Sequence, residues 1–215
     1  TYPKEKSHYV GIPIGSDFVP HSPGQRQILK EKLGFDGQHP LVVITGGGLG
    51  AKRLNDAVAV QLHDLLKMTN VALISGTAQY DELRATTPEN DNRFQLHDFV
   101  THDMALMLGA ADVVVARAGA TTVLELAGLA KPTILVPNGR LTAGHQLKNA
   151  KVYEDKHAVI VVSEVGEDGT VELVDPIRDM LQDKNLQGTL AVNIHKFAKP
   201  HAAREVAELI LAAAN

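Results

Sequence analysis

Four short polar stretches combine residues suited to binding an anion or a polyol, and each follows an apolar run. The first is the glycine loop "GGGLGAKR". Glycines between a strand and a helix let backbone N–H groups approach an anion, and the helix dipole favours negative charge there. Lys52 and Arg53 oppose that dipole by a few tenths to about 1 kcal/mol, which a bound phosphate would offset. The loop therefore predicts a phosphate contact at Gly47 and Gly48; the alternative is a tight turn with two solvated basic residues.

The glycine loop does not match a P-loop, because Ala51-Lys52-Arg53 stands where Gly-Lys-Ser/Thr is required. The dinucleotide fingerprint fits better, since Gly46, Gly48 and Ala51 satisfy Gly-x-Gly-x-x-Gly/Ala. That fingerprint also needs an acidic residue at the end of the next strand, and "LISGTAQ" has none. A nucleotide-sugar diphosphate is the third candidate ligand, and its recognition residues should follow later strands.

The second stretch, "GATTVLE", begins with a tight turn at Gly119 and Ala120 that predicts a second helix N-terminus. Thr122 and Glu125 have the spacing of a capping box, which is the structural explanation for Glu125. The functional explanation has Glu125 accepting hydrogen bonds from two vicinal ribose hydroxyls, while Thr121 and Thr122 donate to a phosphate. The sequence alone leaves both explanations open.

The third stretch, "GHQLKNA", places His145, Gln146 and Asn149 near the start of a predicted helix. Asn149 shares a face with each of the other two. Amide groups pair donors with acceptors, as sugar hydroxyls require. The alternative is an ordinary polar, exposed helix face.

The fourth stretch, "HDFVTHDM", has Phe99 and Val100 at the end of a strand. This apolar pair could support a flat base, and the main chain of Val100 could bond to the edge of that base. Ordinary core packing is the alternative. His102 and Asp103 are explained more simply by a helix start, with the acid near the dipole, than by catalysis.

Short runs rich in Val, Ile and Leu precede or separate these stretches. They are "HYVGIPI", "LVVIT", "VALIS", "FQLHDFV", "DVVVA", "TILVP" and "AVIVV". Continuous apolar runs of this kind are typical of parallel strands buried on both faces. Helix-period segments lie between most of them, so the sequence predicts a Rossmann-like, doubly wound α/β domain. In such a sheet the polar stretches meet at the carboxyl ends of the strands.

Helices are also predicted before and after this α/β region. Ser22, Pro23 and Gln25 form a capping box with proline at the first helical position. Residues 171–184, 187–198 and 201–214 have helical patterns with no strand between them. We expect a linker or the end of a preceding domain over 1–20, the Rossmann-like domain over 21–199, and a C-terminal helix over 200–215 that packs on this domain or on a neighbouring one.

The composition is that of an ordinary globular chain: 215 residues, 44% hydrophobic and 21% charged, with a formal net charge of -4. Without a block of Lys and Arg, no nucleic-acid partner is predicted. The chain contains no cysteine, which fits a reducing cytoplasm, and it has neither a thiolate nor an Asp-x-Asp metal site. No cofactor and no protein-bound metal are predicted, and a loosely held Mg²⁺ on a bound diphosphate stays open. The start "TYPKEK" lacks Met and is typical of a fragment of a longer protein.

Three blocks in this order resemble a known family: "GGGLGAKRLN", "DFVTHDMALMLGAADVVVARAGATTVLELAGLAKPTILVP" and "HQLKNA". The resemblance is to the C-terminal, donor-binding half of the UDP-N-acetylglucosamine:N-acetylmuramyl-(pentapeptide) pyrophosphoryl-undecaprenol N-acetylglucosamine transferase (MurG) family, and it covers nearly the whole chain. It implies one half of a GT-B enzyme that transfers GlcNAc from UDP-GlcNAc to lipid I, with inversion, to give lipid II. It also implies a cytoplasmic protein that is peripheral on the inner face of the plasma membrane.

The resemblance assigns a role to each candidate residue. Phe99 and Val100 would face the uracil, and Glu125 would hold the ribose. Ala120, Thr121 and Thr122 would line the diphosphate at the helix start, and Gln146 and Asn149, with His145, would read the sugar. Gly47, Gly48 and Arg117 complete the predicted UDP-sugar site, and Arg117 stands where the family also has an arginine. The family's general base and acceptor site lie on the N-terminal half, so no catalytic residue is predicted here, and this chain should bind UDP-GlcNAc or UDP without turnover.

Two positions depart from the family pattern. The family usually has serine where Gly48 stands, and often has arginine where Gly15 stands. A divergent member or another acceptor therefore stays open. So do a glycolipid transferase using UDP-galactose, a sugar-nucleotide-binding subunit of a two-chain enzyme, a UDP-GlcNAc epimerase, and an NAD-dependent oxidoreductase, which the missing acid disfavours. The oligomeric state is not predicted.

Overall fold

A six-stranded parallel sheet forms the centre of the protein in the computed structural model, which describes residues 3, 7–47, 51–88, 91–139, 144–165 and 169–214. Its strands are β1 (Leu41–Thr45), β2 (Asn70–Ile74), β3 (Phe94–His97), β4 (Val113–Ala116), β5 (Thr133–Leu135) and β6 (Ile160–Val161). They are arranged in the order β3-β2-β1-β4-β5-β6, and all neighbouring pairs are parallel. The direction of winding reverses between β1 and β4, as in Rossmann folds.

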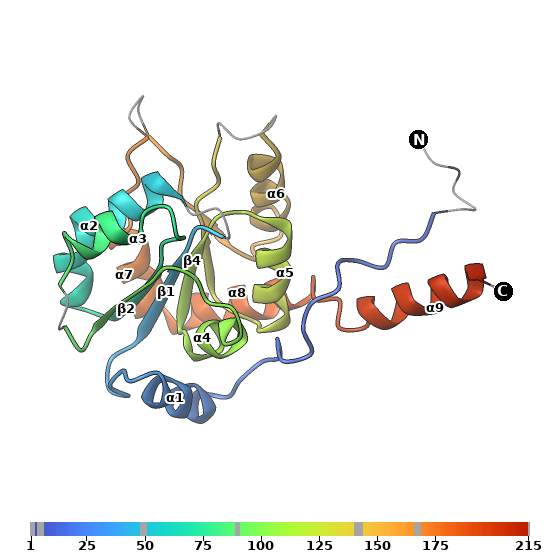
Figure 1. Cartoon of the computed structure of the whole chain (residues 1–215), viewed down its shortest axis with the longest axis horizontal. Coiled ribbons are helices and arrows are strands. Elements are labelled where there is room, and N and C mark those ends of the chain that lie inside the picture. The colour runs from blue at the N-terminus through green and yellow to red at the C-terminus, as the bar shows by residue number, and fades with distance from the viewer. Residues whose placement is uncertain are drawn as a thin grey trace.

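Helices cover both faces of this sheet, which explains why its strands are continuously apolar (Figure 1). Leu41 and Val43 of β1 belong to one core cluster, whereas Val42 and Ile44 belong to the other, and all four are fully buried. The first cluster is covered by α1 (Pro23–Lys32), α4 (Met104–Ala110), α5 (Ala120–Gly128) and α6 (His145–Glu154). The second is covered by α2 (Lys52–Leu66), α3 (Tyr80–Arg84) and α7 (Val174–Gln182). The helix α8 (Lys184–His195) contributes to both.

The predicted capping box of α1 is confirmed: Ser22 accepts from the Gln25 N–H, and the Gln25 side chain accepts from the Ser22 N–H. The expected strand at "HYVGIPI" is wrong, because residues 7–22 form no strand in the described chain. That segment instead follows the outside of the domain, and its Phe18 carbonyl packs so closely on α5 that a Cβ on Gly128 would lie 2.6 Å from it.

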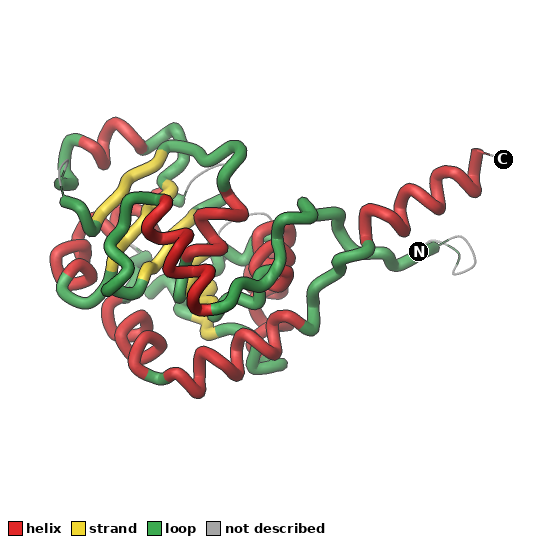
Figure 2. The backbone as a smooth tube through the Cα atoms, turned by 90° about the horizontal axis from the view of Figure 1, so that it is seen from below, coloured by secondary structure: helices red, strands yellow, loops and turns green. Residues whose placement is uncertain are grey.

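The C-terminal helix α9 (Ala202–Ala214) projects from the domain beside the N-terminal segment (Figure 2). Among its described residues only Ala202 is buried, and Ile210 and Leu211 are more than 60% exposed. Lys199, just before it, lies 5.1 Å from the centre of the Tyr9 ring. Packing of α9 on a neighbouring domain stays a prediction.

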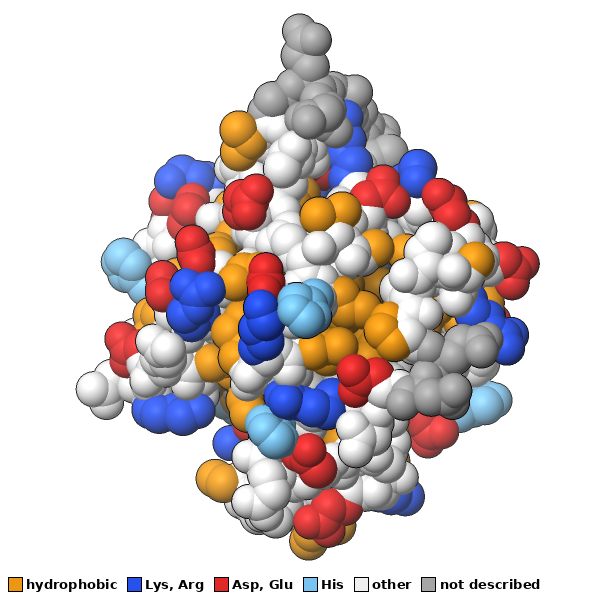
Figure 3. Space-filling model, turned by 90° about the vertical axis from the view of Figure 1, so that its left-hand side faces the viewer, with side chains coloured by type: hydrophobic (Ala, Val, Ile, Leu, Met, Phe, Trp, Pro, Cys, Tyr) orange, Lys and Arg blue, Asp and Glu red, His pale blue; other side chains and the backbone are white. Residues whose placement is uncertain are grey.

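The face at the left of Figure 1 carries interspersed acidic and basic side chains around a central group of hydrophobic ones (Figure 3). This face therefore has no surface of a single sign of charge. No helix among the described residues is both long and apolar enough to cross a bilayer.

Candidate functional site

A cavity of about 460 Å³ opens at the carboxyl edge of the sheet, around the point where the strand order reverses. Ligands of open α/β sheets bind at this position. The cavity gathers six of the twelve residues that the sequence singled out. These six are Gly47, Phe99, Val100, Thr121, Thr122 and Glu125. Segments that are far apart in the chain, after β1, after β3 and at the start of α5, therefore form one site.

Glu125 lies on the wall of this cavity and does not cap α5. The N-cap of α5 is Gly119, and no side chain bonds to the free N–H groups of the first turn. The capping-box explanation is therefore wrong. The Glu125 carboxylate is about half-buried and has no hydrogen-bond partner among the described residues. Burial raises the pKa of this carboxyl above its ordinary value of 4.5. A desolvated, unpaired acceptor that lines a cavity is suited to a ligand that donates hydrogen bonds.

The start of α5 supplies donors at the same wall. Val123 donates to the Gly119 carbonyl, so the N–H groups of Ala120, Thr121 and Thr122 precede the first helical bond. The hydroxyls of Thr121 and Thr122 line the cavity, whereas Ala120 is exposed beside it. This helix start can therefore stabilise an anion next to the Glu125 carboxylate.

The glycine loop reaches the cavity through Gly47. This residue has φ +80°, a left-handed conformation that favours glycine, and a Cβ built there would meet no atom within 4 Å. Gly48 lies outside the described residues, so the contact predicted there stays a prediction. Lys52, in the first turn of α2, pairs with Asp56 at 3.1 Å and Glu82 at 3.6 Å. Neighbouring carboxylates thus offset its unfavourable position at the helix start.

Arg117 is turned away from the cavity. Its side chain is 5% exposed, and its Nη1 donates to the Val136 carbonyl at 2.8 Å and to Glu164 at 2.7 Å. The second carboxylate oxygen of Glu164 accepts from Arg53 of α2 at 2.7 Å. Burial alone would raise the pKa of Glu164, but these two hydrogen bonds lower it below its ordinary value. Arg117 therefore joins the ends of β4, β5 and β6 to α2, and sequence reasoning missed Glu164, which carries no motif.

Phe99 and Val100 occupy the part of the cavity that follows β3. Phe99 is 50% exposed, so its ring is available to a flat ligand. Val100 packs against the core, while its main-chain N–H and C=O bond to no other described residue. This combination of an apolar side chain and open backbone groups matches the predicted contact with a base.

The polar residues of α6 lie beside the cavity but do not line it. The Gln146 side-chain oxygen accepts from the Asn138 N–H at 2.9 Å, and the Asn149 amide donates to the Ala118 carbonyl at 3.1 Å. Both amides therefore tie α6 to the turns after β5 and β4. The Gln146 Nε2 and Asn149 Oδ1 have no hydrogen-bond partner among the residues that the structure describes, and His145 is exposed.

The other nine residues that line the cavity were not predicted as binding residues from the sequence, and Asp17, Phe18 and His102 are among them. Asp17 and Phe18 come from the segment before α1, and His102 precedes α4. No motif marks Asp17 or Phe18, because only the folded chain brings this segment against α5. Gly128, in the middle of a helical pattern, was the available signal for a close backbone approach.

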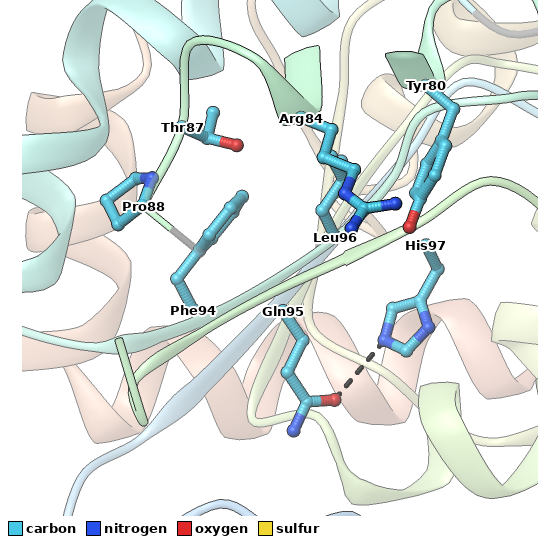
Figure 4. A pocket seen from close by; sticks show the side chains of 8 residues that line it. All are labelled: Tyr80, Arg84, Thr87, Pro88, Phe94, Gln95, Leu96 and His97. Carbon is cyan, nitrogen blue, oxygen red and sulfur yellow. Dashed lines mark hydrogen bonds between the residues drawn. The ribbon is translucent and has the colours of Figure 1, made fainter. Parts of the chain in front are cut away.

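A larger cavity of about 550 Å³ lies against the edge strand β3 and α3 (Figure 4). In it His97 lies 3.2 Å from the Gln95 side-chain oxygen, with Tyr80 and Arg84 above them. None of the twelve predicted residues lines this cavity, and it lies away from the reversal of strand order, so the smaller cavity is the better candidate.

Among the described residues no group of His, Asp and Glu could hold a metal ion.

Comparison with known proteins identifies the family of most of the chain. Residues 41–206 match the model of the glycosyltransferase family 28 C-terminal domain. The chain is 35% identical over 210 residues to a protein of Acetivibrio thermocellus and 30% identical over 212 residues to one of Flavobacterium psychrophilum. Both are named UDP-N-acetylglucosamine--N-acetylmuramyl-(pentapeptide) pyrophosphoryl-undecaprenol N-acetylglucosamine transferase. These alignments cover 96% and 98% of this chain but 56% of each relative, so the chain spans about half the length of the curated relatives it matches.

Solved structures show the same fold. Acinetobacter baumannii MurG superposes with a TM-score of 0.69 at 24% identity, over 93% of this chain and 57% of that one. WaaG, a glycosyltransferase involved in lipopolysaccharide biosynthesis, gives 0.64 at 19% identity, over 97% and 57%. The predicted architecture, one Rossmann-like half of a GT-B glycosyltransferase, is confirmed.

Proposed function

The chain belongs to the glycosyltransferase family 28 C-terminal domains, and from that premise we propose that it binds the UDP-N-acetylglucosamine donor of an inverting N-acetylglucosaminyltransferase. The whole enzyme would convert lipid I to lipid II in peptidoglycan synthesis. The names of the relatives support this assignment. Within the proposal, the acceptor and the general base belong to a further domain, and the enzyme acts at the inner face of the plasma membrane.

The observation that carries the proposal is the Glu125 carboxylate, which lines the cavity half-buried and unpaired within the described chain. A ribose offers two adjacent hydroxyl donors, which match the two oxygens of one carboxylate. Phe99 and the open main chain of Val100 lie in the same cavity and would take the uracil ring and its edge. The nucleoside would thus fill the side between β3 and α5.

The diphosphate would lie at the start of α5. Transfer of the sugar breaks its bond to the diphosphate, and negative charge develops on the departing UDP. Donors fixed before the reaction stabilise such charge without reorganisation. The first-turn N–H groups of α5 and the hydroxyls of Thr121 and Thr122 supply them. The chain would therefore assist departure of UDP, while proton removal from the acceptor would fall to the other domain.

The sugar would extend from the cavity toward α6. Within the described chain, one hydrogen bond holds each of Asn149 and Gln146, and the Asn149 oxygen and the Gln146 amide nitrogen have no partner. Such fixed amides suit the discrimination of sugar hydroxyls. We assign the choice between GlcNAc and galactose to these two residues, with His145 beside them.

Isothermal titration calorimetry of this chain with UDP, UDP-GlcNAc, UDP-galactose, ADP and NAD tests the proposal. We expect the uridine nucleotides to bind saturably. We also expect UDP-GlcNAc to bind more tightly than UDP-galactose. Tighter binding of UDP-galactose would favour a glycolipid transferase instead. NAD binding in the absence of UDP binding would overturn the assignment.

A second assay tests the division of labour between domains. The chain alone should not transfer labelled GlcNAc from UDP-GlcNAc to lipid I, because the proposed general base lies elsewhere. Robust turnover by this chain would show that the base is present in it. Failure of UDP to bind would refute the donor site itself, so the two outcomes are distinct.

A further inference from the structure

A second polar pocket lies at the opposite, amino edge of the sheet. It occupies about 390 Å³ between α1, α8 and the turns that precede β4 and β5. Its ionisable lining is unbalanced, with four basic side chains and one acidic side chain. These are His21, Arg26, Lys131, Lys184 and Asp112. We call it the amino-edge pocket; its basic excess contrasts with the chain's formal net charge of -4.

Lys131 is the buried base of this pocket. It is 2% exposed, and its Nζ donates to the Gly109 and Ala111 carbonyls, each at 2.7 Å. A protonated amine has a third N–H, which has no partner within the described chain. Burying a cation is costly unless its charge is compensated, and neither carbonyl carries a full negative charge.

The single carboxylate of the pocket is already shared. Asp112 contacts Lys30 at 2.5 Å, accepts from the Leu41 N–H at 2.9 Å, and lies 3.6 Å from the Arg26 Nε. It therefore cannot also compensate Lys131 and Lys184 in full. The basic excess of the amino-edge pocket persists after the ion pairs among its described residues are counted.

Two buried nitrogen atoms at this pocket have no hydrogen-bond partner within the described residues. They are the Arg26 Nε and the His21 Nδ1. The Arg26 Nη1 is used, since it donates to the His21 carbonyl at 3.2 Å. The His21 ring is held against α4, where a Cβ on Gly109 would lie 3.1 Å from it. The Arg26 Nε thus has only its 3.6 Å ion pair with Asp112, and a buried polar atom without a hydrogen bond calls for a further partner.

We propose that the amino-edge pocket binds a phosphate group, as inorganic phosphate or a phosphate monoester, at a site separate from the donor cavity. A phosphate supplies the negative charge that the pocket lacks and several acceptor oxygens for its open donors. Arg26 and His21 supply these donors from one side, Lys131 from the floor and Lys184 from the rim. This binding does not depend on the proposed donor function, because the two sites lie at opposite edges of the sheet.

Protonation should be coupled to this binding. Burial, followed by the charges of Lys131 and Arg26, lowers the pKa of His21. Burial, followed by the charges of Arg26 and Lys30, lowers the pKa of Lys131 to about 7, while Asp112 opposes that shift. Lys184 of α8 is the remaining charged group that lines the pocket. A bound phosphate favours both protonated forms, so its binding should be accompanied by proton uptake by these two side chains.

Titration of the whole chain with inorganic phosphate, followed by calorimetry at constant ionic strength and with saturating UDP present, tests the proposal. We expect saturable binding that Arg26→Gln weakens roughly tenfold and Lys184→Gln roughly threefold. Lys196→Gln is the matched control, because Lys196 is an exposed lysine at the other end of the same helix and outside the pocket. Phosphate binding by this control should equal that of the unmodified protein.

The source of the phosphate is resolved by comparing glycerol 3-phosphate with vesicles that contain phosphatidic acid, whose headgroup is also a phosphate monoester, in the same variants. If Lys184→Gln weakens binding of the soluble ester but not binding to the vesicles, the ligand is a small molecule. If it also weakens binding to the vesicles, the ligand is a lipid headgroup. Absence of saturable phosphate binding, or equal affinity in Arg26→Gln, Lys184→Gln and Lys196→Gln, overturns the proposal. Because these variants lie away from the donor cavity, this failure would leave UDP binding unaffected.

Discussion

Replacing Glu125 by Gln should weaken UDP binding while leaving the fold intact. The substitution keeps the shape of the side chain but removes the charge that would accept both ribose hydroxyls. Hydrogen bonds to a charged group contribute about 1.5–3 kcal/mol; because Glu125 is only half-buried, we expect a loss of about 1–3 kcal/mol. That corresponds to an increase in Kd on the order of 5- to 150-fold. The unliganded protein should lose no stability, since the carboxylate has no partner in the described chain.

Calorimetry with UDP and urea unfolding of the same samples check this pair of expectations. Glu31→Gln is the matched control, because it makes the same charge change at an exposed position on α1. A helix cap would behave in the opposite way: its loss would cost about 1 kcal/mol of folding free energy and leave the affinity of the folded protein unchanged. Unfolding at lower urea with an unaltered Kd would therefore refute the reasoning.

The raised pKa of Glu125 adds a pH dependence to the same experiment. Between pH 4.5 and the raised pKa, Glu125 holds a proton in the folded state that it has released in the unfolded state. The contribution of Glu125 to stability therefore falls as the pH rises through that window. Ribose hydroxyls favour the ionised carboxylate, so UDP affinity should fall as the pH drops through the raised pKa. Glu125→Gln should remove both dependences.

Three further substitutions test other parts of the structure. Glu164→Ala leaves the buried Arg117 and the partly exposed Arg53 without their shared carboxylate and should cost about 3–5 kcal/mol in urea unfolding; a loss below 1 kcal/mol would contradict it. Lys131→Met should flatten the pH dependence of stability. Between about pH 7 and 10.5 the unfolded chain holds the proton that folded Lys131 has lost, so the unmodified protein gains stability as the pH rises through this range. Parallel curves of stability against pH for the two proteins would disprove this. Gly128→Ala brings a Cβ within 2.6 Å of the Phe18 carbonyl; it should weaken UDP binding and lower stability by about 1–3 kcal/mol, whereas unchanged values for both would show that the segment is not held there.

Most secondary structure could be predicted from local patterns, because its determinants are local. The capping box at Ser22 fixed the start of α1, and the apolar spacing of Leu54, Val58 and Leu62 marked the buried face of α2. The prediction failed where a local pattern had no partner: "HYVGIPI" has the composition of a strand, yet no neighbouring strand pairs with it in the described chain. The short α3 was missed because five residues carry too little periodicity.

The sequence by itself determined the fold class and brought three of the four polar stretches to the cavity, because parallel strands carry all their carboxyl ends to one edge. Gly47, Phe99 and Glu125 are brought together in this way. Only the tertiary structure decided what each side chain does there. From sequence spacing alone, Glu125 was compatible with a helix cap and Arg117 was compatible with a ligand contact. Whether a polar group is already satisfied depends on residues distant in the chain, such as Glu164, and that pairing exists only once the sheet has formed.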